Sequence, residues 1–388
     1  MLQLGRLDER ISAHLDGIAV AADQGSALCR QALDPPGIGT TFAATVRSIE
    51  LRDADWLGKL LDIAHAMPQV RPGVISAFGW VTAAGLSGIA SPLLASPDVW
   101  RRRVGISAYG MHSVDPGATT LLDALDAQSE PGLRACALRM AGILGRVELR
   151  DTCAAIARSG AADATPLEAS RAALLLGDRD SSVATLRRLV SAPNERRDEG
   201  LGLLLKVSAP DESLALLREL RGDPGAIRTL VRAVGIAGTP HFMPWLIGLM
   251  DDVKLSRIAG ESFSLITGLD LAYLDLDRKP PEDVEFGPND DPADIDVAID
   301  EDDGLPWPDP ERIAAWWKTN GPRFAPGIRY FMGERPTTAH CRSVLQAGFQ
   351  RQRHHAAEYL CLLKPGTPLF NVAAPAWRQR RLLAQLSG

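Results

Sequence analysis

Three stretches in the middle of the chain decide the fold: "RPGVISAFGWVTAAG" at 71–85, "RRVGISAYGMHSVDPGATTLLDAL" at 102–125 and "RACALRMAGILGRVELRDTCAAI" at 134–156. Written above one another, they align three arginines and three glycines: Arg71, Arg102 and Arg134, then Gly79, Gly110 and Gly142. The aligned positions are 31 and 32 residues apart. Self-similarity at such a period is typical of repeat proteins.

Weaker copies begin at residues 168, 196, 226 and 255. Each has an alanine- and leucine-rich helix, a break at Gly, Asp or Pro, and in most copies a second helix with apolar residues at three- and four-residue steps. Such a helical hairpin buries its apolar face only by stacking on its neighbours. We therefore expect an all-α fold, an α-solenoid of HEAT-like hairpins over 70–270, rather than an irregular all-α bundle. The recurrent small residues would let adjacent helices approach closely.

The flanks of the repeats differ in composition. Residues 1–69 have a helical pattern, with Asp53 as an expected N-cap, and are predicted to form an N-terminal helical cap. Residues 271–304 are predicted to be an acidic loop or disordered linker, because like charges repel one another there. Residues 305–388 form a basic, tryptophan-containing region that is expected to be mostly helical.

Charge is distributed in opposite blocks. Residues 270–310 hold fifteen Asp and Glu against Arg278 and Lys279, a net charge of −13. Residues 311–388 hold twelve Lys and Arg against three Glu, a net charge of +9. We expect the acidic stretch to fold against a basic face of the C-terminal region; the alternative is that each block binds a separate partner. An EF-hand loop beginning at Asp294 fails, because its sixth residue is Ile299 instead of Gly.

The stretch "LPWPDPERIAAWW" at 305–317 is interpreted as the point where ordered structure resumes. Asp309 is an expected N-cap and Pro310 suits the first helical position. Trp307 is expected to anchor the end of the acidic stretch by apolar contact. Trp316 and Trp317 point about 100° apart around a helix, so one is expected to enter the core and the other to meet a neighbour or a partner.

The 31-residue hairpins resemble HEAT-like repeats of the short bacterial type. Together with "RLDERISAHLDGI", "ESFSLITGLDL", "LPWPDPERIAAWW" and "RQRHHAAEYLCLLKPGTPLFNVAAPAWRQRRLL", they resemble an uncharacterised proteobacterial family over essentially the whole chain. Members of that family are often encoded among type VI secretion genes, beside spike-tip proteins, toxins and their adaptors. The family has no defined catalytic residues, so the resemblance implies no site.

Several classes of function are disfavoured. The net charge of −6 argues against nucleic-acid binding, and five cysteines without a CxxC pair signal neither disulfides nor zinc. No nucleophile elbow, P-loop, HExxH or His-Glu dipeptide occurs. The N-terminal stretch is charged, and no apolar run is long enough for a membrane span. We expect a soluble cytoplasmic protein without metal or cofactor.

The sequence favours a non-enzymatic protein-binding scaffold: an adaptor or chaperone for a type VI secreted effector or spike component, or else an immunity protein that neutralises a toxin. An enzyme or effector with a site in the C-terminal region is a further alternative, with candidate residues His340, His354, His355, Glu358 and Cys361. The aligned arginines either pair with acidic loop residues or line a surface for an acidic partner. The candidate partner-binding residues are Arg71, Arg102, Arg134, Trp307, Trp316, Trp317, Arg351, Arg353, Trp377 and Arg378.

Overall fold

The computed structural model describes residues 1–159, 165–191, 194–282, 284 and 299–386. Over these residues almost every element is a helix, and the strands are two short pieces, which confirms the predicted all-α class. The chain separates into two compact units: Met1–Thr185 with Leu345–Gly388, and Leu186–Val344. The region predicted as one C-terminal part, 305–388, is therefore divided between the units.

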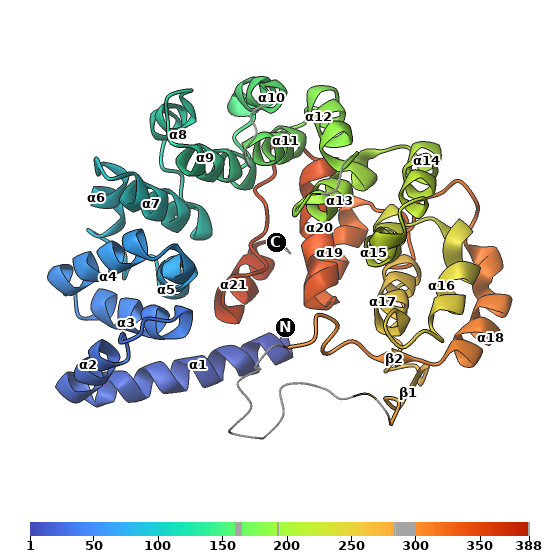
Figure 1. The fold of residues 1–388 in the computed structure, drawn as a ribbon, viewed down its shortest axis with the longest axis horizontal. Coiled ribbons are helices and arrows are strands. Elements are labelled where there is room, and N and C mark those ends of the chain that lie inside the picture. The colour runs from blue at the N-terminus through green and yellow to red at the C-terminus, as the bar shows by residue number, and fades with distance from the viewer. Residues whose placement is uncertain (160–164, 192–193, 283, 285–298, 387–388) are drawn as a thin grey trace. The chain divides into compact units, whose positions relative to one another are not determined.

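The first unit is built from helices of both chain ends (Figure 1). They are α1 (Leu2–Val20), α2 (Ala22–Gln31), α3 (Ile38–Glu50), α4 (Ala54–Ala66), α5 (Arg71–Trp80), α6 (Ala90–Leu94), α7 (Val99–Met111), α8 (Ala118–Leu125), α9 (Pro131–Ile143), α10 (Arg150–Arg158), α11 (Thr165–Leu175), α20 (Gln350–Leu363) and α21 (Ala376–Leu386), with 3₁₀ turns η1 (Pro68–Val70) and η2 (Val147–Leu149). The unit boundaries fall within α12 (Ser181–Val190) and α19 (Thr338–Ala347).

The second unit is continuous in sequence. It contains α13 (Arg197–Val207), α14 (Pro210–Arg221), α15 (Ile227–Ala237), α16 (Met243–Leu249), α17 (Ser256–Thr267) and α18 (Pro310–Asn320), the 3₁₀ turns η3 (Pro224–Ala226), η4 (Pro240–Phe242) and η5 (Gly321–Arg323), and the strands β1 (Asp277–Arg278) and β2 (Trp307–Pro308). The strands pair antiparallel, and β2 lies beside α17.

Alternate helices pack on one another in series. In the first unit α3 contacts α5, α5 contacts α7, α7 contacts α9 and α9 contacts α11; in the second, α13 contacts α15 and α15 contacts α17. Glycines make the approach close: a Cβ on Gly142 would lie 3.0 Å from Ala172 Cα, and one on Gly235 would lie 2.9 Å from Ser262 Cα. The expectation that small residues bring these helices together is confirmed at both positions.

The segment after α20 runs along the carboxyl ends of three of these helices in the first unit. The Leu369 N–H donates to Ile143 O of α9 (2.8 Å), and the Asn371 amide donates to Met111 O of α7 (3.3 Å). Arg378 Nη2 donates to Val81 O, directly after α5 (3.0 Å). The last carbonyls of a helix have no partner within the helix, so this segment satisfies groups at the ends of α7 and α9 and directly after α5.

Candidate functional site

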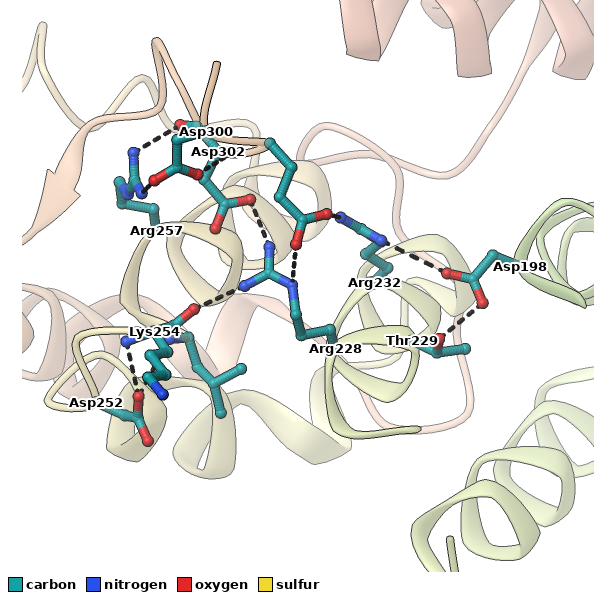
Figure 2. Close-up of polar contacts among 11 residues, drawn as sticks. Asp198, Arg228, Thr229, Arg232, Asp252, Lys254, Arg257, Asp300 and Asp302 are labelled. Carbon is teal, nitrogen blue, oxygen red and sulfur yellow. Dashed lines mark hydrogen bonds and ion pairs between the residues drawn. The ribbon is translucent and has the colours of Figure 1, made fainter. Parts of the chain in front are cut away.

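Three arginines in the second unit converge on an acidic segment of the same chain (Figure 2). Arg228 and Arg232 are four residues apart on α15 and therefore share one face of that helix. Arg257 stands at the start of α17, which packs against α15. We call these three residues the arginine cluster. The acidic segment is residues 300–302: Asp300, Glu301 and Asp302.

Each arginine contacts at least one of the three carboxylates. Arg228 Nη2 lies 2.8 Å from Asp302 Oδ1, and its Nε lies 2.6 Å from Glu301 Oε1. Arg232 Nη2 lies 2.6 Å from Glu301 Oε2. Arg257 pairs with Asp300 and donates to the main-chain carbonyl of Asp302 (3.1 Å). Glu301 is thus shared between two arginines of one helix, and Asp302 between arginines of two helices.

Neighbouring groups hold the arginine cluster in place. Arg228 also donates to Lys254 O (2.7 Å), at the approach to α17. On the other side, Asp198 of α13 lies 3.5 Å from Arg232 and accepts a hydrogen bond from Thr229 (2.7 Å), as Figure 2 shows. Side-chain networks of this kind stabilise by more than the sum of their separate contacts.

The solvent exposure of the paired side chains increases from one side of the site to the other. The side chains of Asp302 and Arg257 are only 5% and 8% exposed, whereas those of Arg232 and Glu301 are 40% and 56% exposed. Because water screens exposed pairs and competes for their hydrogen bonds, the Arg232 edge is held less strongly than the Arg257 edge. One side of the site is therefore anchored and the other is accessible.

Two carboxylates of the segment, those of Asp300 and Glu301, are stabilised in their charged form. The Asp302 N–H, which donates to Asp300 Oδ1 (2.8 Å), and then Arg257 lower the pKa of Asp300. The hydrogen bond from Arg232 lowers the pKa of Glu301. Burial alone would lower the pKa of Arg228, but the hydrogen bond and charge of Asp302 outweigh it and raise that pKa. These pKa shifts favour the charged forms of Asp300, Glu301 and Arg228 in the site.

The expected partner of the acidic stretch is corrected for residues 300–302. Their carboxylates pair with helices α15 and α17 and not with the basic C-terminal region, whereas Asp309 pairs with Arg312 of that region (3.3 Å). The prediction compared the net charges of long blocks of sequence. A net charge does not reveal that the arginine cluster brings three cations together on α15 and α17. Residues 283 and 285–298 of the stretch, including Asp294, lie outside the described residues.

The aligned arginines bind main-chain carbonyls. Arg71 Nε donates to Ala64 O (2.9 Å), and Arg134 donates to Ala127 O, in each case seven residues back. Arg197, which begins α13, repeats the contact with Val190 O (3.0 Å). The expected pairing with acidic loop side chains is therefore wrong for Arg71 and Arg134: Arg71 satisfies a carbonyl in the last turn of α4, and Arg134 satisfies one just after α8. Arg102 is half-buried on α7 and makes no such bond among the described residues.

The tryptophans behave in two ways. Trp307 is 6% exposed, as expected of an anchoring side chain, and the Arg257 guanidinium lies 4.8 Å from its ring centre. Trp316 and Trp317 are both half-buried, and their ring centres lie 6.0 and 6.3 Å from that of Phe263. Both rings meet neighbours in one aromatic cluster, as expected for one of them, but neither is fully buried in the core, as was expected for the other.

The same stretch gives the predicted helix start. Asp309 accepts hydrogen bonds from the N–H groups of Glu311 and Arg312, both at 3.1 Å, and Pro310 occupies the first helical position of α18. The N-cap prediction is confirmed here and also at Asp53, which accepts from Trp56 N–H (2.9 Å).

The basic C-terminal residues are mostly structural. Arg353 is 1% exposed and donates to Leu345 O (2.7 Å) and Gln379 Oε1 (2.6 Å). Arg378 is 3% exposed, and burial lowers its pKa to about 10. As partner-binding candidates both are corrected, because an enclosed guanidinium cannot reach a partner. Arg351 is exposed on α20.

Trp377 is 40% exposed and is the predicted tryptophan most open to solvent. It contributes to a recess of about 440 Å³ in the first unit, lined also by Asp8, Glu50, Trp80 and Arg380. The guanidinium of Arg378 lies 5.1 Å from the centre of the Trp377 ring, within the range of a cation–π contact. Its mixed charges and open mouth give the recess no evident reaction chemistry.

The residues of the enzyme alternative have structural partners. Glu358 is 3% exposed and pairs with Arg171 (2.9 Å) and His354 (3.5 Å). Burial raises the pKa of the Cys361 thiol to about 12, which leaves it protonated and a poor nucleophile. His340, in the second unit, hydrogen-bonds through Nε2 to Phe331 O (2.8 Å). His355 lies beside His354, with ring centres 5.9 Å apart.

Comparisons with known proteins give no relative: no family model, no curated protein and no solved structure matches the chain. Within the described residues, no helix combines the length and apolar character needed to cross a membrane. In the same part of the chain, no three His, Cys, Asp or Glu side chains are grouped to hold a metal ion.

Proposed function

We propose that this chain is a protein-binding scaffold, an α-solenoid of HEAT-like hairpins that serves in the cytoplasm as an adaptor or chaperone for a type VI secreted effector or spike component. Series packing of alternate helices supports the repeat architecture. The family resemblance supplies the secretion context. A row of stacked helices offers a long surface for a partner protein.

One observation carries the proposal: the repeat helices α15 and α17 hold a polypeptide segment by its side chains and one carbonyl. The contacts are charge-assisted hydrogen bonds, which are short and directional and suit recognition of another chain. A scaffold that binds one segment of polypeptide in this manner has the chemistry needed to bind a second.

Co-expression with the products of neighbouring secretion genes tests this function. The expected result is one product that co-purifies at a one-to-one ratio and remains bound during size-exclusion chromatography. The double variant Arg102→Glu with Trp377→Ala, which alters a repeat-helix position and an exposed ring, serves to locate the binding face. A chain that binds none of these products and is toxic when expressed alone would contradict the proposal and support an effector.

A further inference from the structure

We infer that the arginine cluster is a docking surface for an acidic segment of the partner protein, and that residues 300–302 of this chain occupy it until that partner binds. The inference rests on the proposed scaffold function and adds the chemistry of the partner. The occupant consists of three consecutive carboxylates, Asp300, Glu301 and Asp302, and the receptor consists of three arginines on two helices.

The contacts require little beyond negative charge. Arg228, Arg232 and Arg257 bind carboxylate oxygens and the main-chain carbonyl of Asp302. No apolar side chain of residues 300–302 takes part, because all three residues are acidic. An extended partner segment with three neighbouring Asp or Glu residues presents the same oxygens, since guanidinium groups read carboxylates by geometry and charge.

The base of the acidic stretch is closed independently of the arginine cluster. Strand β1 pairs with β2 through Asp277 with Pro308 and Arg278 with Trp307, and the Asp309 N–H donates to Leu276 O (2.8 Å). The pairing of β1 with β2 therefore remains when residues 300–302 leave the arginine cluster. It also preserves the Trp307 ring against Arg257, so that arginine stays oriented for a new carboxylate.

Exchange can begin at the open edge. Glu301 is 56% exposed, and its partner Arg232 keeps Asp198 at 3.5 Å when Glu301 leaves. A competing carboxylate meets Arg232 first and then displaces the buried Asp302. The tethered segment competes at an effective concentration on the order of millimolar, so a neutralised segment should reveal much tighter binding of an added acidic peptide.

The test uses a fluorescent peptide with the sequence of residues 298–306, "AIDEDDGLP", and fluorescence anisotropy at low salt. We expect the full chain carrying Asp300→Asn, Glu301→Gln and Asp302→Asn to bind this peptide at least tenfold more tightly than the unaltered chain. Binding should disappear on adding Arg228→Gln and Arg232→Gln, and should weaken steeply with salt. A peptide with Asn and Gln in place of its acids should not bind.

Asp303→Asn is the matched control. It removes one charge from the adjacent residue, which is exposed and whose carboxylate contacts none of the three arginines in the described structure, and it should leave peptide affinity unchanged. If the triple variant fails to fold, Glu301→Gln alone should strengthen binding severalfold, because that side chain is largely exposed.

Equal binding to the triple variant and the unaltered chain, or binding that survives loss of Arg228 and Arg232, would overturn the inference. A partner that co-purifies although the acidic peptide never binds contradicts only this docking surface. A peptide that binds as expected, without any co-purifying partner, supports the surface and contradicts the scaffold function.

Discussion

Two arginine sites in this molecule differ in burial and in the acceptors that the guanidinium groups bind. In the first unit Arg353 is 1% exposed and donates to neutral acceptors, Leu345 O and the side-chain oxygens of Gln350 and Gln379. In the second unit the arginine cluster binds carboxylates and opens to solvent at Arg232. The first guanidinium is enclosed and bonds to neutral acceptors, whereas the second site has charges that water and salt can reach. Burial and acceptor type, rather than the charge of a sequence block, determine what an arginine does.

The electrostatics of the two sites differ accordingly. Burial lowers the pKa of Arg353. At Arg228 burial acts in the same direction, but the hydrogen bond and charge of Asp302, with Glu301 and Asp300 nearby, reverse it. Both guanidinium groups remain charged at neutral pH. The contrast predicts that Arg353 contributes mainly to stability and the arginine cluster mainly to exchangeable binding.

Arg353→Ala should have the largest effect, a loss of about 4 kcal/mol in the free energy of unfolding. It leaves the buried Gln379 side chain (0% exposed) and Leu345 O without a donor. Urea titration followed by circular dichroism measures the change, which should vary little with salt. Arg351→Ala, on the exposed side of the same helix, should stay within about 0.5 kcal/mol of the unaltered chain. Similar losses of stability for Arg353→Ala and Arg351→Ala would contradict the claim that the buried contacts of Arg353 stabilise the fold.

Arg257→Ala should cost less, about 2 kcal/mol, although Arg257 is nearly as buried. Asp300 is 38% exposed, so water hydrates the abandoned carboxylate, while Trp307 loses its cation contact. The same urea titration applies, with the exposed Lys318→Ala as control. A loss in the free energy of unfolding as large as that of Arg353→Ala would show that the arginine cluster stabilises the fold as much as Arg353 does.

Acid should weaken only the carboxylate site. The pKa values of Asp300 and Glu301 are lowered in the folded chain. Their contribution is therefore complete above their unfolded pKa values, near pH 4, and is lost as the pH falls through the lower folded values. The stability difference between the unaltered chain and the Asp300→Asn, Glu301→Gln variant should be constant from pH 5 to 8 and shrink below about pH 4. A constant difference down to pH 3 would mean that these carboxylates are not held by ionic contacts.

Salt should produce the smallest change, visible as local release without unfolding. Exposed ion pairs stabilise by about 0–1 kcal/mol each and are screened at high ionic strength. A glutamate-specific protease should cleave after Glu301 several times faster in 0.5 M salt than in 0.05 M salt. Cleavage after Glu282, an exposed residue before the segment, should change much less and corrects for the protease's own response to salt. Parallel changes at both sites would indicate that the segment is not held by charge.

The features predicted from the sequence were those set by nearby residues. The N-caps at Asp53 and Asp309 act over two or three residues, and small residues such as Gly142 mark places where two helices approach closely. The burial of Arg353 depends on Gln379, 26 residues away, and its polar surroundings in sequence suggested an exposed helix turn. The arginine cluster meets the acidic segment across 74 residues at Arg228 and 43 at Arg257. The local signal for that site was the pair Arg228 and Arg232 on one helix face.

The segment that runs along the ends of α5, α7 and α9 affects when the protein can mature on the ribosome. Residues 369–378 satisfy carbonyls of helices that were synthesised more than two hundred residues earlier. The second unit is contiguous in sequence and can complete its packing during synthesis. The first unit cannot do so until residues 369–378 have been synthesised. Premature termination before residue 369 should therefore yield a chain with one finished unit and one recognisably incomplete unit, which gives cellular quality control a means of detecting truncated products.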